Sequence, residues 1–232
     1  MYSLKRYAFC FSFFVFQINS FAQNKVLTAV ETKINNLVKK MTIEEKVSLT
    51  HAKAKFLNGG VPRLGIPSLN PSDGPHGVRM DLKENWEPLN NINDSGTYLP
   101  TGNTLAATWN PQLGFEYGKV LGEEAKYRKK DIILGPGINI IRGPLNGRNF
   151  EYLSEDPYLI SKMVVGYING VQSQGISACV KHFIANNQET NRNTVNVNMS
   201  DRALHEIYLP GFKAAVTEAK VKMEDVNFNE DK

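Results

Sequence analysis

The chain has 232 residues, of which 41% are hydrophobic and 22% charged, which is typical of a globular protein able to bury a core. Its formal charge of +4 is spread along the sequence, without any basic block beyond short pairs such as Lys39–Lys40 and Lys129–Lys130. This pattern gives no support to nucleic-acid binding, and we expect no nucleic-acid partner.

The first 22 residues have the pattern of a secretory signal peptide. Two cations precede an apolar run over residues 7–18, and a small-residue cleavage pattern follows at residues 20–22. The apolar run is too short to anchor a mature protein in a bilayer. We therefore expect cleavage near Ala22, a mature chain starting near Gln23 without membrane contact, and a periplasmic or secreted location.

Cleavage would remove Cys10 and leave Cys179 as the remaining cysteine. A single cysteine cannot form an internal disulfide. Cys179 lies in an apolar run, which favours a buried and unreactive thiol over a nucleophile.

The mature chain begins with two predicted helices. Apolar residues recur at helical spacing from Val26 to Met41, and Thr42 with Glu45 forms a capping-box pattern that opens the second helix. Prolines and glycines then interrupt the chain. We expect a strand over residues 66–70 that runs into a rigid loop at residues 72–77.

Helix and strand patterns alternate in the rest of the chain. Asn110 and Asp156, each followed by a proline, are N-cap signals, while Ser200 and Asp201 cap a last helical region that Pro210 interrupts. Continuous apolar runs between the helices predict strands buried on both faces. The predicted elements are helices over residues 110–127, 156–175 and 200–219 and strands over residues 131–134 and 176–183.

This alternation, with short connections, indicates an α/β fold with a parallel sheet. A (β/α)₈ barrel is one of the two common ways to build such a sheet, and a whole barrel takes roughly 250 residues. Because only about three or four units are recognisable, we expect a partial (β/α)₈ TIM-type barrel.

Polar side chains follow three of the predicted strands, at the edge where parallel α/β folds build their sites. They are Asp73, Arg148 and the pair Lys181–His182. A carboxylate can accept hydrogen bonds from two neighbouring hydroxyls, while Arg, Lys and His donate to oxygens, so this mixture suits a sugar.

Adjacent carboxylates elsewhere in the chain are poor candidates for catalysis. Neighbours on a helix point about 100° apart and cannot flank one bond, so we assign Glu44–Glu45, Glu123–Glu124 and Glu155–Asp156 to helix surfaces and caps. We expect Glu151 and Glu155 to hold the loop that presents Arg148 rather than to touch a substrate.

No motif indicates a metal or cofactor. His51, His76 and His205 lack zinc-binding spacing, and the glycines around Gly135 and Gly143 do not form a dinucleotide-binding motif. On its own, His182 would be a structural histidine, since lone histidines are weak signals of function.

Several longer motifs, in the same order along the chain, change that interpretation. They are SDGPHGVR at 72–79, LAATWN at 105–110, GRNFEY at 147–152, SEDP at 154–157 and KHF at 181–183. Together they resemble the N-terminal catalytic domain of glycoside hydrolase family 3, from about Met41 to Val221.

The resemblance implies a set of substrate-binding residues for a β-linked oligosaccharide or glycoside. Asp73 would grip hydroxyls of the sugar in the cleavage subsite, and the cations and histidine would donate hydrogen bonds to it. The implied residues are Asp73, Arg79, Arg148, Lys181, His182 and Arg192. No cofactor is implied.

The resemblance also implies a retaining glycosidase mechanism, in which a nucleophilic carboxylate and a carboxylic acid lie about 5 Å apart. In the family the nucleophile follows a later strand and the acid comes from a following domain, so we expect both beyond Lys232 and no catalytic residue here. We expect residues 23–221 to be an incomplete domain and residues 222–232 a divergent tail in place of an apolar strand. Asp225 and Asp231 are not candidate nucleophiles.

The residues after the Lys-His pair favour one branch of the family. Residues 184–192 lack the histidine-bearing loop of N-acetylhexosaminidases and resemble the β-glucosidase and β-xylosidase branch. The sequence does not distinguish a glucoside from a xyloside as the substrate. The chain alone is expected to be inactive, so a non-catalytic sugar-binding protein and a fragment of an interrupted gene are the alternatives.

Overall fold

The computed structural model describes residues 29–54, 56–81 and 95–226. The predicted signal peptide lies outside the described residues. The chain divides into two compact units, one formed by the residues up to His51 with Gly59–Pro67 and the other by Ala52–Asn58 with Ser68–Lys232.

The first unit contains a helix over residues 29–40 and helix α2 (Ile43–Ser48). The predicted capping box is confirmed, because the Thr42 hydroxyl accepts a hydrogen bond from Glu45 N (3.2 Å) and the Glu45 carboxylate accepts one from Thr42 N (2.9 Å). The same carboxylate pairs with Arg63, which lies in a 3₁₀ turn at Pro62–Leu64.

The second unit opens with a short antiparallel hairpin of β1 (Ala52–Ala54) and β2 (Leu57–Asn58). The strand predicted over residues 66–70 is wrong. Leu69 makes only an isolated bridge to Asn58, and the strand begins after it, as β3 (Pro71–Asp73). Leu69 instead exchanges two backbone hydrogen bonds with Asn58, of 2.9 and 3.2 Å.

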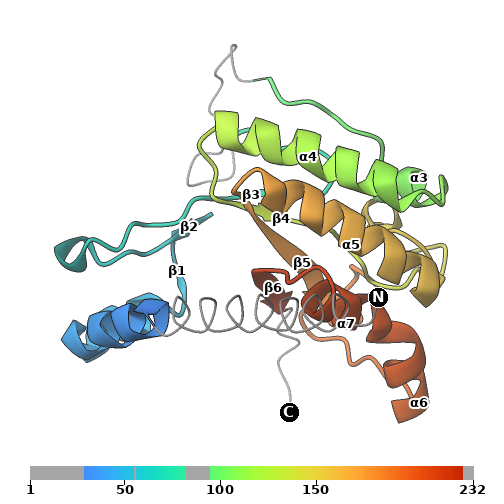
Figure 1. The fold of residues 1–232 in the computed structure, drawn as a ribbon. Helices are drawn as coiled ribbons and strands as arrows, with labels where there is room; N and C mark the ends of the chain where they lie inside the picture. The colour runs from blue at the N-terminus through green and yellow to red at the C-terminus, as the bar shows by residue number, and fades with distance from the viewer. Residues whose placement is uncertain (1–28, 55, 82–94, 227–232) are drawn as a thin grey trace, which may run out of the picture. The chain divides into compact units, whose positions relative to one another are not determined.

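Four parallel strands form the sheet of the second unit, and their order in the sheet follows their order in the chain (Figure 1). The strands are β3, β4 (Ile132–Leu134), β5 (Ser177–Phe183) and β6 (Met223–Val226). β4 and β5 confirm the strands predicted over residues 131–134 and 176–183. β6 differs from the expectation for the tail, because the backbone of residues 223–226 pairs with β5 although the sequence there lacks an apolar run.

The helices predicted over residues 110–127, 156–175 and 200–219 and the caps at Asn110, Asp156 and Ser200 are confirmed, whereas the short helix at Gly102–Ala106 was not predicted. The helices are α3 (Gly102–Ala106), α4 (Pro111–Tyr127), α5 (Pro157–Ser173), α6 (Asp201–Ala203), continued by a π-helical turn at Leu204–Tyr208, and α7 (Pro210–Thr217). Asn110 accepts hydrogen bonds from two backbone amides of α4, and Asp156 accepts one from α5. Ser200 caps α6 in the same way.

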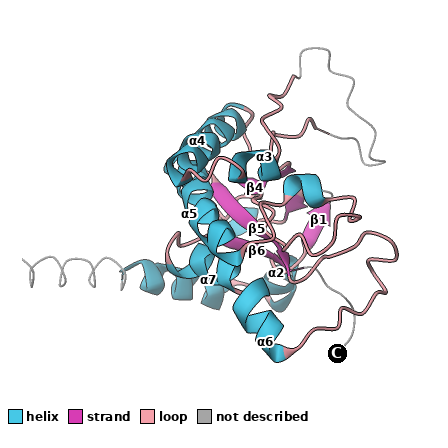
Figure 2. Cartoon of the chain, turned by 90° about the vertical axis from the view of Figure 1, so that its right-hand side faces the viewer, coloured by secondary structure: helices cyan, strands magenta, loops and turns pink. Residues whose placement is uncertain are grey.

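Helices α4, α5 and α7 all lie on one side of the strands, as Figure 2 shows. Each helix connects two neighbouring parallel strands, so the sheet winds in one direction. A doubly wound sheet would reverse its strand order and place helices on both faces. The arrangement is the TIM-type α/β fold that the sequence predicts, seen here as four strands of a barrel.

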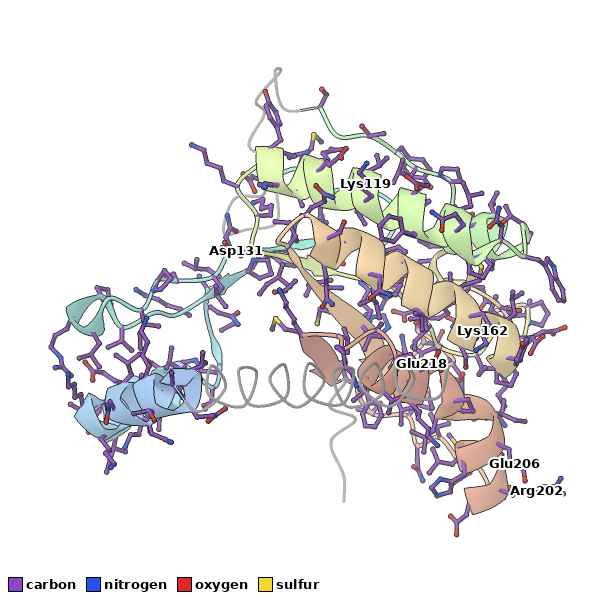
Figure 3. All side chains as sticks on the ribbon, in the orientation of Figure 1. Lys119, Asp131, Lys162, Arg202, Glu206 and Glu218 are labelled. Carbon is purple, nitrogen blue, oxygen red and sulfur yellow. The ribbon has the colours of Figure 1, made fainter. Side chains whose placement is uncertain are left out.

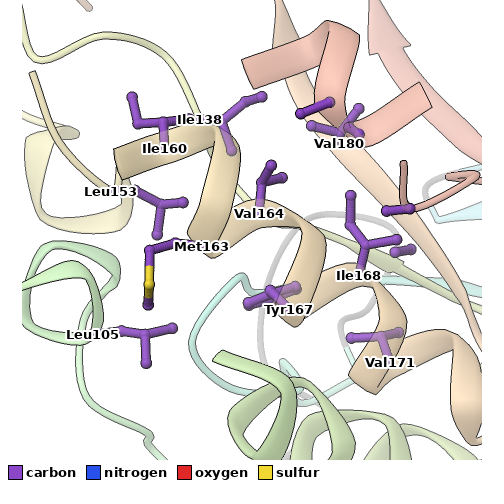
Figure 4. Packing of buried hydrophobic residues seen from close by; sticks show 14 of the residues in the cluster. Leu105, Ile138, Leu153, Ile160, Met163, Val164, Tyr167, Ile168, Val171 and Val180 are labelled. Carbon is purple, nitrogen blue, oxygen red and sulfur yellow. The ribbon is translucent and has the colours of Figure 1, made fainter. Parts of the chain in front are cut away.

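Helices α4 and α5 pack along a seam lined by glycines. A Cβ atom added to Gly118 would lie 2.1 Å from the Tyr167 carbonyl oxygen, and one added to Gly170 would lie 2.1 Å from that of Phe115. The seam adjoins the core in Figure 4, where Met163 of α5 lies beside Leu105 and Leu153, and Val164 and Ile168 lie on the side of α5 toward Val180 of β5. The Tyr167 hydroxyl donates to the Pro75 carbonyl (2.7 Å), which ties α5 to the loop after β3.

Polar contacts also connect segments at the surface of this unit. Asp131, before β4, accepts a hydrogen bond from Asn70 N before β3 (2.8 Å), while Lys162 of α5 lies 3.9 Å from Glu218 after α7 (Figure 3). Cys179 is buried, as predicted. Among the described residues, no helix is both long and apolar enough to cross a membrane.

Candidate functional site

The predicted site residues meet at the carboxyl-terminal ends of the strands. Asp73 is the last residue of β3, Lys181 and His182 lie near the end of β5, and Arg148 lies in the loop that follows β4. The structure therefore brings together residues that are up to 109 positions apart, because parallel strands end at the same edge of the sheet (182 − 73 = 109).

Asp73 and Lys181 form the centre of the site. Lys181 Nζ donates to Asp73 Oδ1 at 2.7 Å, and its side chain is only 3% exposed. Burial alone would raise the pKa of Asp73, but the Lys181 charge and hydrogen bond and the Gly74 amide outweigh it, so this pKa is lowered. Asp73 is therefore an ionised acceptor whose side chain remains 31% exposed.

The backbone around Lys181 is held by the chain that continues from β4. Lys181 N donates to the Pro136 carbonyl (3.0 Å), and Ile138 N donates to the Lys181 carbonyl (2.7 Å). Both hydrogen bonds fix the point at which the lysine leaves the sheet. The ammonium group is thereby directed at Asp73 and at Glu151, whose Oε2 lies 3.7 Å away.

Arg148 is held by two carboxylates. Its Nε donates to Glu151, whose side chain is 5% exposed, and its Nη1 lies 3.6 Å from Glu189 Oε1. The prediction that Glu151 supports Arg148 is confirmed. For Glu155 the role of holding this loop stays a prediction, since its side chain is exposed and the carboxylate partners of Arg148 among the described residues are Glu151 and Glu189.

Both ring nitrogens of His182 have partners in the protein. Arg148 Nη2 lies 2.9 Å from Nε2 and can only donate, so Nε2 is the acceptor and Nδ1 carries the proton. Nδ1 then donates to the Tyr152 hydroxyl oxygen at 3.1 Å. Burial first, and then the Arg148 and Lys181 charges, lower the pKa of His182 to about 2, so the ring is neutral.

The two remaining predicted residues lie at the margin of this cluster. Arg79 Nη1 is 3.5 Å from Asp73 Oδ2, and its guanidinium lies 5.9 Å from the centre of the Phe56 ring. Arg192 donates to Glu189 Oε2 at 2.9 Å. Arg79 thus contacts Asp73 directly, whereas Arg192 is joined to the cluster through Glu189.

Four residues of the site were missed by sequence reasoning. Glu189 bridges Arg148 and Arg192, and Asn186 donates both to Glu189 (2.9 Å) and to the Tyr152 hydroxyl (3.0 Å). Asn139 exchanges two hydrogen bonds with the His182 backbone. The missed residues are Asn139, Tyr152, Asn186 and Glu189. Tyr152, Asn186 and Glu189 lie inside the noted segments, but nothing in the sequence showed where they point.

The chemistry of the cluster is that of binding polar oxygens. Its three carboxylates, Asp73, Glu151 and Glu189, are each paired with a cation, and its histidine is neutral. Such a site offers fixed donors and acceptors to hydroxyl groups. Within residues 29–54, 56–81 and 95–226, no group of three or more metal-ligating side chains is placed to hold a metal ion.

Comparison with known proteins identifies the family to which this chain belongs. Residues 61–230 match the glycosyl hydrolase family 3 N terminal domain. The chain belongs to glycosyl hydrolase family 3. The match contains all six residues that the resemblance singled out.

Two relatives of the chain carry the names of glycosidases. The chain is 55% identical to "Beta-glucosidase BoGH3A" of Bacteroides ovatus, over 82% of this chain and 26% of that protein. It is 45% identical to an "Exo-alpha-(1->6)-L-arabinopyranosidase" of Bifidobacterium longum, over 79% of this chain and 24% of that protein.

A solved structure shows the same fold. The family 3 chain superposes on β-glucosidase 3B of Thermotoga neapolitana, solved with α-D-glucose, with a TM-score of 0.76 and 41% identity. The superposition covers 84% of this chain and 30% of the other. The chain thus spans about a quarter of the length of the curated relatives it matches.

Proposed function

We propose that this family 3 chain supplies the sugar-binding part of a β-glucosidase-type active site, in a protein that hydrolyses terminal β-D-glycosidic bonds with retention of configuration. The observation that carries the proposal is Asp73, an ionised and partly exposed carboxylate held by the buried Lys181 at the strand ends. Lys181 and the Gly74 amide hold Oδ1, while the contact of Oδ2 within the described part of the chain is a long one to Arg79. Oδ2 is therefore the atom that would accept hydrogen bonds from a sugar.

The binding role of Asp73 follows from its charge. A retaining glycosidase needs a carboxylic acid that stays protonated near neutral pH, and a lowered pKa makes Asp73 unsuited to that task. Glu151 and Glu189 are each paired with an arginine. We therefore assign the acid to a residue other than these three. All three carboxylates are also engaged by Lys181 or an arginine, and on this ground we assign the nucleophile to another residue as well.

Arg148, Lys181 and the margin arginines would donate to the sugar oxygens. Because both nitrogens of His182 have partners in the protein, we assign this histidine to orienting Arg148. The names of the relatives support a glucoside as substrate, and the arabinopyranosidase relative makes a pentopyranoside the sugar to compare.

Secretion is a second part of the proposal. The cations and apolar run of residues 1–22 support a cleaved signal peptide, and the family 3 domain would follow it. Expression in a bacterial host tests this directly. N-terminal sequencing of the exported protein should begin near Gln23, whereas an uncleaved Met1 would contradict the proposal.

The binding role is tested by titrating the full chain with methyl β-D-glucoside and methyl β-D-xyloside, followed by calorimetry or NMR. Asp73→Asn should weaken binding by more than about tenfold, since it removes a charged hydrogen-bond acceptor. Glu123→Gln, on the exposed surface of α4, is the matched control and should bind as the wild type does. Equal binding by both variants would overturn the role given to Asp73.

A parallel assay separates binding from catalysis. The chain should release no p-nitrophenol from an aryl β-glucoside, because the described carboxylates of the site lack the roles that hydrolysis needs. Release of p-nitrophenol by the wild-type chain would show that residues of this chain carry out bond cleavage. That result would contradict the assignment of the nucleophile and the acid to other residues.

The alternative is a protein that binds sugar without hydrolysing it. It is favoured by the same observation, that every predicted residue at the site is a binding group. Binding of the glucoside without release of p-nitrophenol, in the longest product that the source cells make, would favour this alternative.

A further inference from the structure

We infer that Lys130 is a positioning residue of the sugar site, because it holds the segment that carries Arg79 and thereby keeps the Arg79 guanidinium at Asp73. The inference rests on the proposed function and deepens it, since Arg79 is one of the arginines that would donate to the sugar. It starts from a buried ammonium group outside the cluster. The Lys130 side chain is only 5% exposed, although it belongs to a short basic pair in the sequence.

Lys130 lies in the turn between α4 and β4, where the chain enters the sheet. Its backbone amide donates to the Ala125 carbonyl (2.9 Å), which fixes the point from which the side chain starts. Its Nζ pairs with the Asp81 carboxylate and lies 3.4 Å from Asn70 Oδ1. A buried ammonium group is costly unless it is paired. The ion pair therefore fixes the position of Asp81.

The segment that contains Arg79 runs back alongside β3, after the loop that follows Asp73. The Arg79 amide donates to the Asp73 carbonyl (3.1 Å), and the Arg79 carbonyl accepts from the Ser72 hydroxyl (3.4 Å). Just before it, the Val78 carbonyl accepts from Arg128 Nη1 (3.2 Å). These hydrogen bonds hold the chain up to Arg79 against the strand that presents Asp73.

The ion pair of Lys130 holds the same segment on the other side of Arg79. Asp81 is two residues beyond Arg79, so the backbone is fixed both before and after the arginine. The side chains of Asp73, Arg79, Asp81 and Lys130 line one cavity of about 330 Å³. Two pairs of opposite charge thus lie together, one at the sugar site and one behind it.

Arg79 needs this support because its contact with Asp73 is weak. Its Nη1 lies 3.5 Å from Asp73 Oδ2, which is long for a charged hydrogen bond. An ion pair of this kind contributes little, whereas holding an arginine side chain in one geometry costs rotamer freedom. The contact with Asp73 alone therefore does not order the guanidinium, and the fixed backbone has to contribute.

The other groups of the site do not depend on Lys130. Asp73 Oδ1 is held by Lys181 and the Gly74 amide, and Arg148 is held by its own carboxylates. Loss of the Lys130 charge should therefore leave these groups in place and release the Arg79 guanidinium. The whole effect on sugar binding should then pass through Arg79.

The test is a calorimetric titration of the full chain with methyl β-D-glucoside. Lys130→Met keeps the apolar stem and should weaken binding by about three- to tenfold, as expected for partial loss of one hydrogen bond. The double variant Lys130→Met/Asp81→Asn leaves no buried charge without its partner, so it guards against unfolding, and it should weaken binding equally. Lys129→Met, at the adjacent lysine, is the matched control and should bind as the wild type does.

A double-mutant cycle with Arg79→Met separates positioning from a general structural role. If Lys130 acts through Arg79, Lys130→Met should change the affinity by less than about twofold in the Arg79→Met protein. A structural role would weaken binding by the same factor whether or not Arg79 is present.

The outcomes separate this inference from the proposed function. Weakened binding in both Lys130 variants, but not in Lys129→Met, that disappears in the Arg79→Met background would support the inference. Wild-type affinity in the folded variants, or an equal loss in the Arg79→Met background, would overturn it and leave the proposed function standing. Failure of the wild-type chain to bind the glucoside would overturn the proposed function, and the positioning role with it.

Discussion

The seam between α4 and α5 is buried and the cluster at the strand ends is partly buried, and different forces hold the two regions together. Along the seam, glycines let two backbones approach until no side chain fits between them, and apolar residues fill the flanks. At the strand ends, cations and carboxylates are withdrawn from water and held by one another. The seam is specified by shape and the cluster by charge, so the two regions should respond to different substitutions.

The largest effect is expected at the seam. Gly118→Val would place side-chain atoms where the Tyr167 carbonyl lies, and backbone cannot rotate away as a side chain can. We expect a loss of more than about 3 kcal/mol in the free energy of unfolding, measured by urea denaturation, because overpacking forces the two helices apart. Gly143→Val is the control, since nothing lies within 4 Å of a Cβ atom at Gly143. Comparable losses in both variants would contradict the account of the seam.

The second-largest loss of stability is expected when a charge is removed from the cluster. Glu151→Gln keeps the shape of the side chain but leaves Arg148 and Lys181 without their buried counter-charge. Breaking a buried ion pair costs about 3 kcal/mol, which should shift the urea midpoint downward. In Glu123→Gln, an exposed substitution, the change should stay within about 0.5 kcal/mol. A Glu151→Gln protein as stable as the wild type would show that charge does not specify the cluster.

The smallest expected effect is a pH dependence that comes from the cluster. His182 has a folded-state pKa of about 2, far below its unfolded value, so the unfolded chain binds the additional proton as the pH falls. Stability is therefore full above about pH 6.5 and declines below it, by about 2 kcal/mol at pH 5. Unfolding curves at pH 7 and pH 5 measure the loss.

Two further groups, His76 and Asp73, decide the pH range in which the loss of stability should be measured. Burial also lowers the pKa of His76, which adds to the loss in the same direction. The lowered pKa of Asp73 acts only below the usual carboxylate range, near pH 4 and lower. His182→Gln should therefore flatten the decline between pH 6.5 and pH 5 without abolishing it. A decline of unchanged slope would contradict the neutral, buried histidine.

Local signals were enough to predict most of the fold. The Asn110 and Asp156 caps and the apolar runs of β4 and β5 each depend on a few neighbouring residues, and each prediction was correct. β3 and β6 were misplaced or missed because they are short and joined to the sheet by backbone pairing. Such pairing depends on strands that are distant in the sequence, and it does not require a regular pattern of apolar residues within the strand itself.

The sequence was enough to locate the candidate site, but it did not show in which directions the side chains of the site point. Motifs placed Asp73, Arg148, Lys181 and His182 at one edge, and the structure brings them together. The partners that set their directions, above all Glu189, come from other loops and leave no pattern. The seam could have been foreseen, because the glycines of α4 recur every four residues, which puts them on one face of the helix.

The strand order of the sheet has a consequence for how the chain is made. Strands β3, β4, β5 and β6 lie side by side in the order in which a ribosome releases them. Each of β4, β5 and β6 can therefore pair with a strand that is already in place. With synthesis at roughly 5–20 residues per second, the newest strand exposes its free edge for only some seconds before the next one covers it.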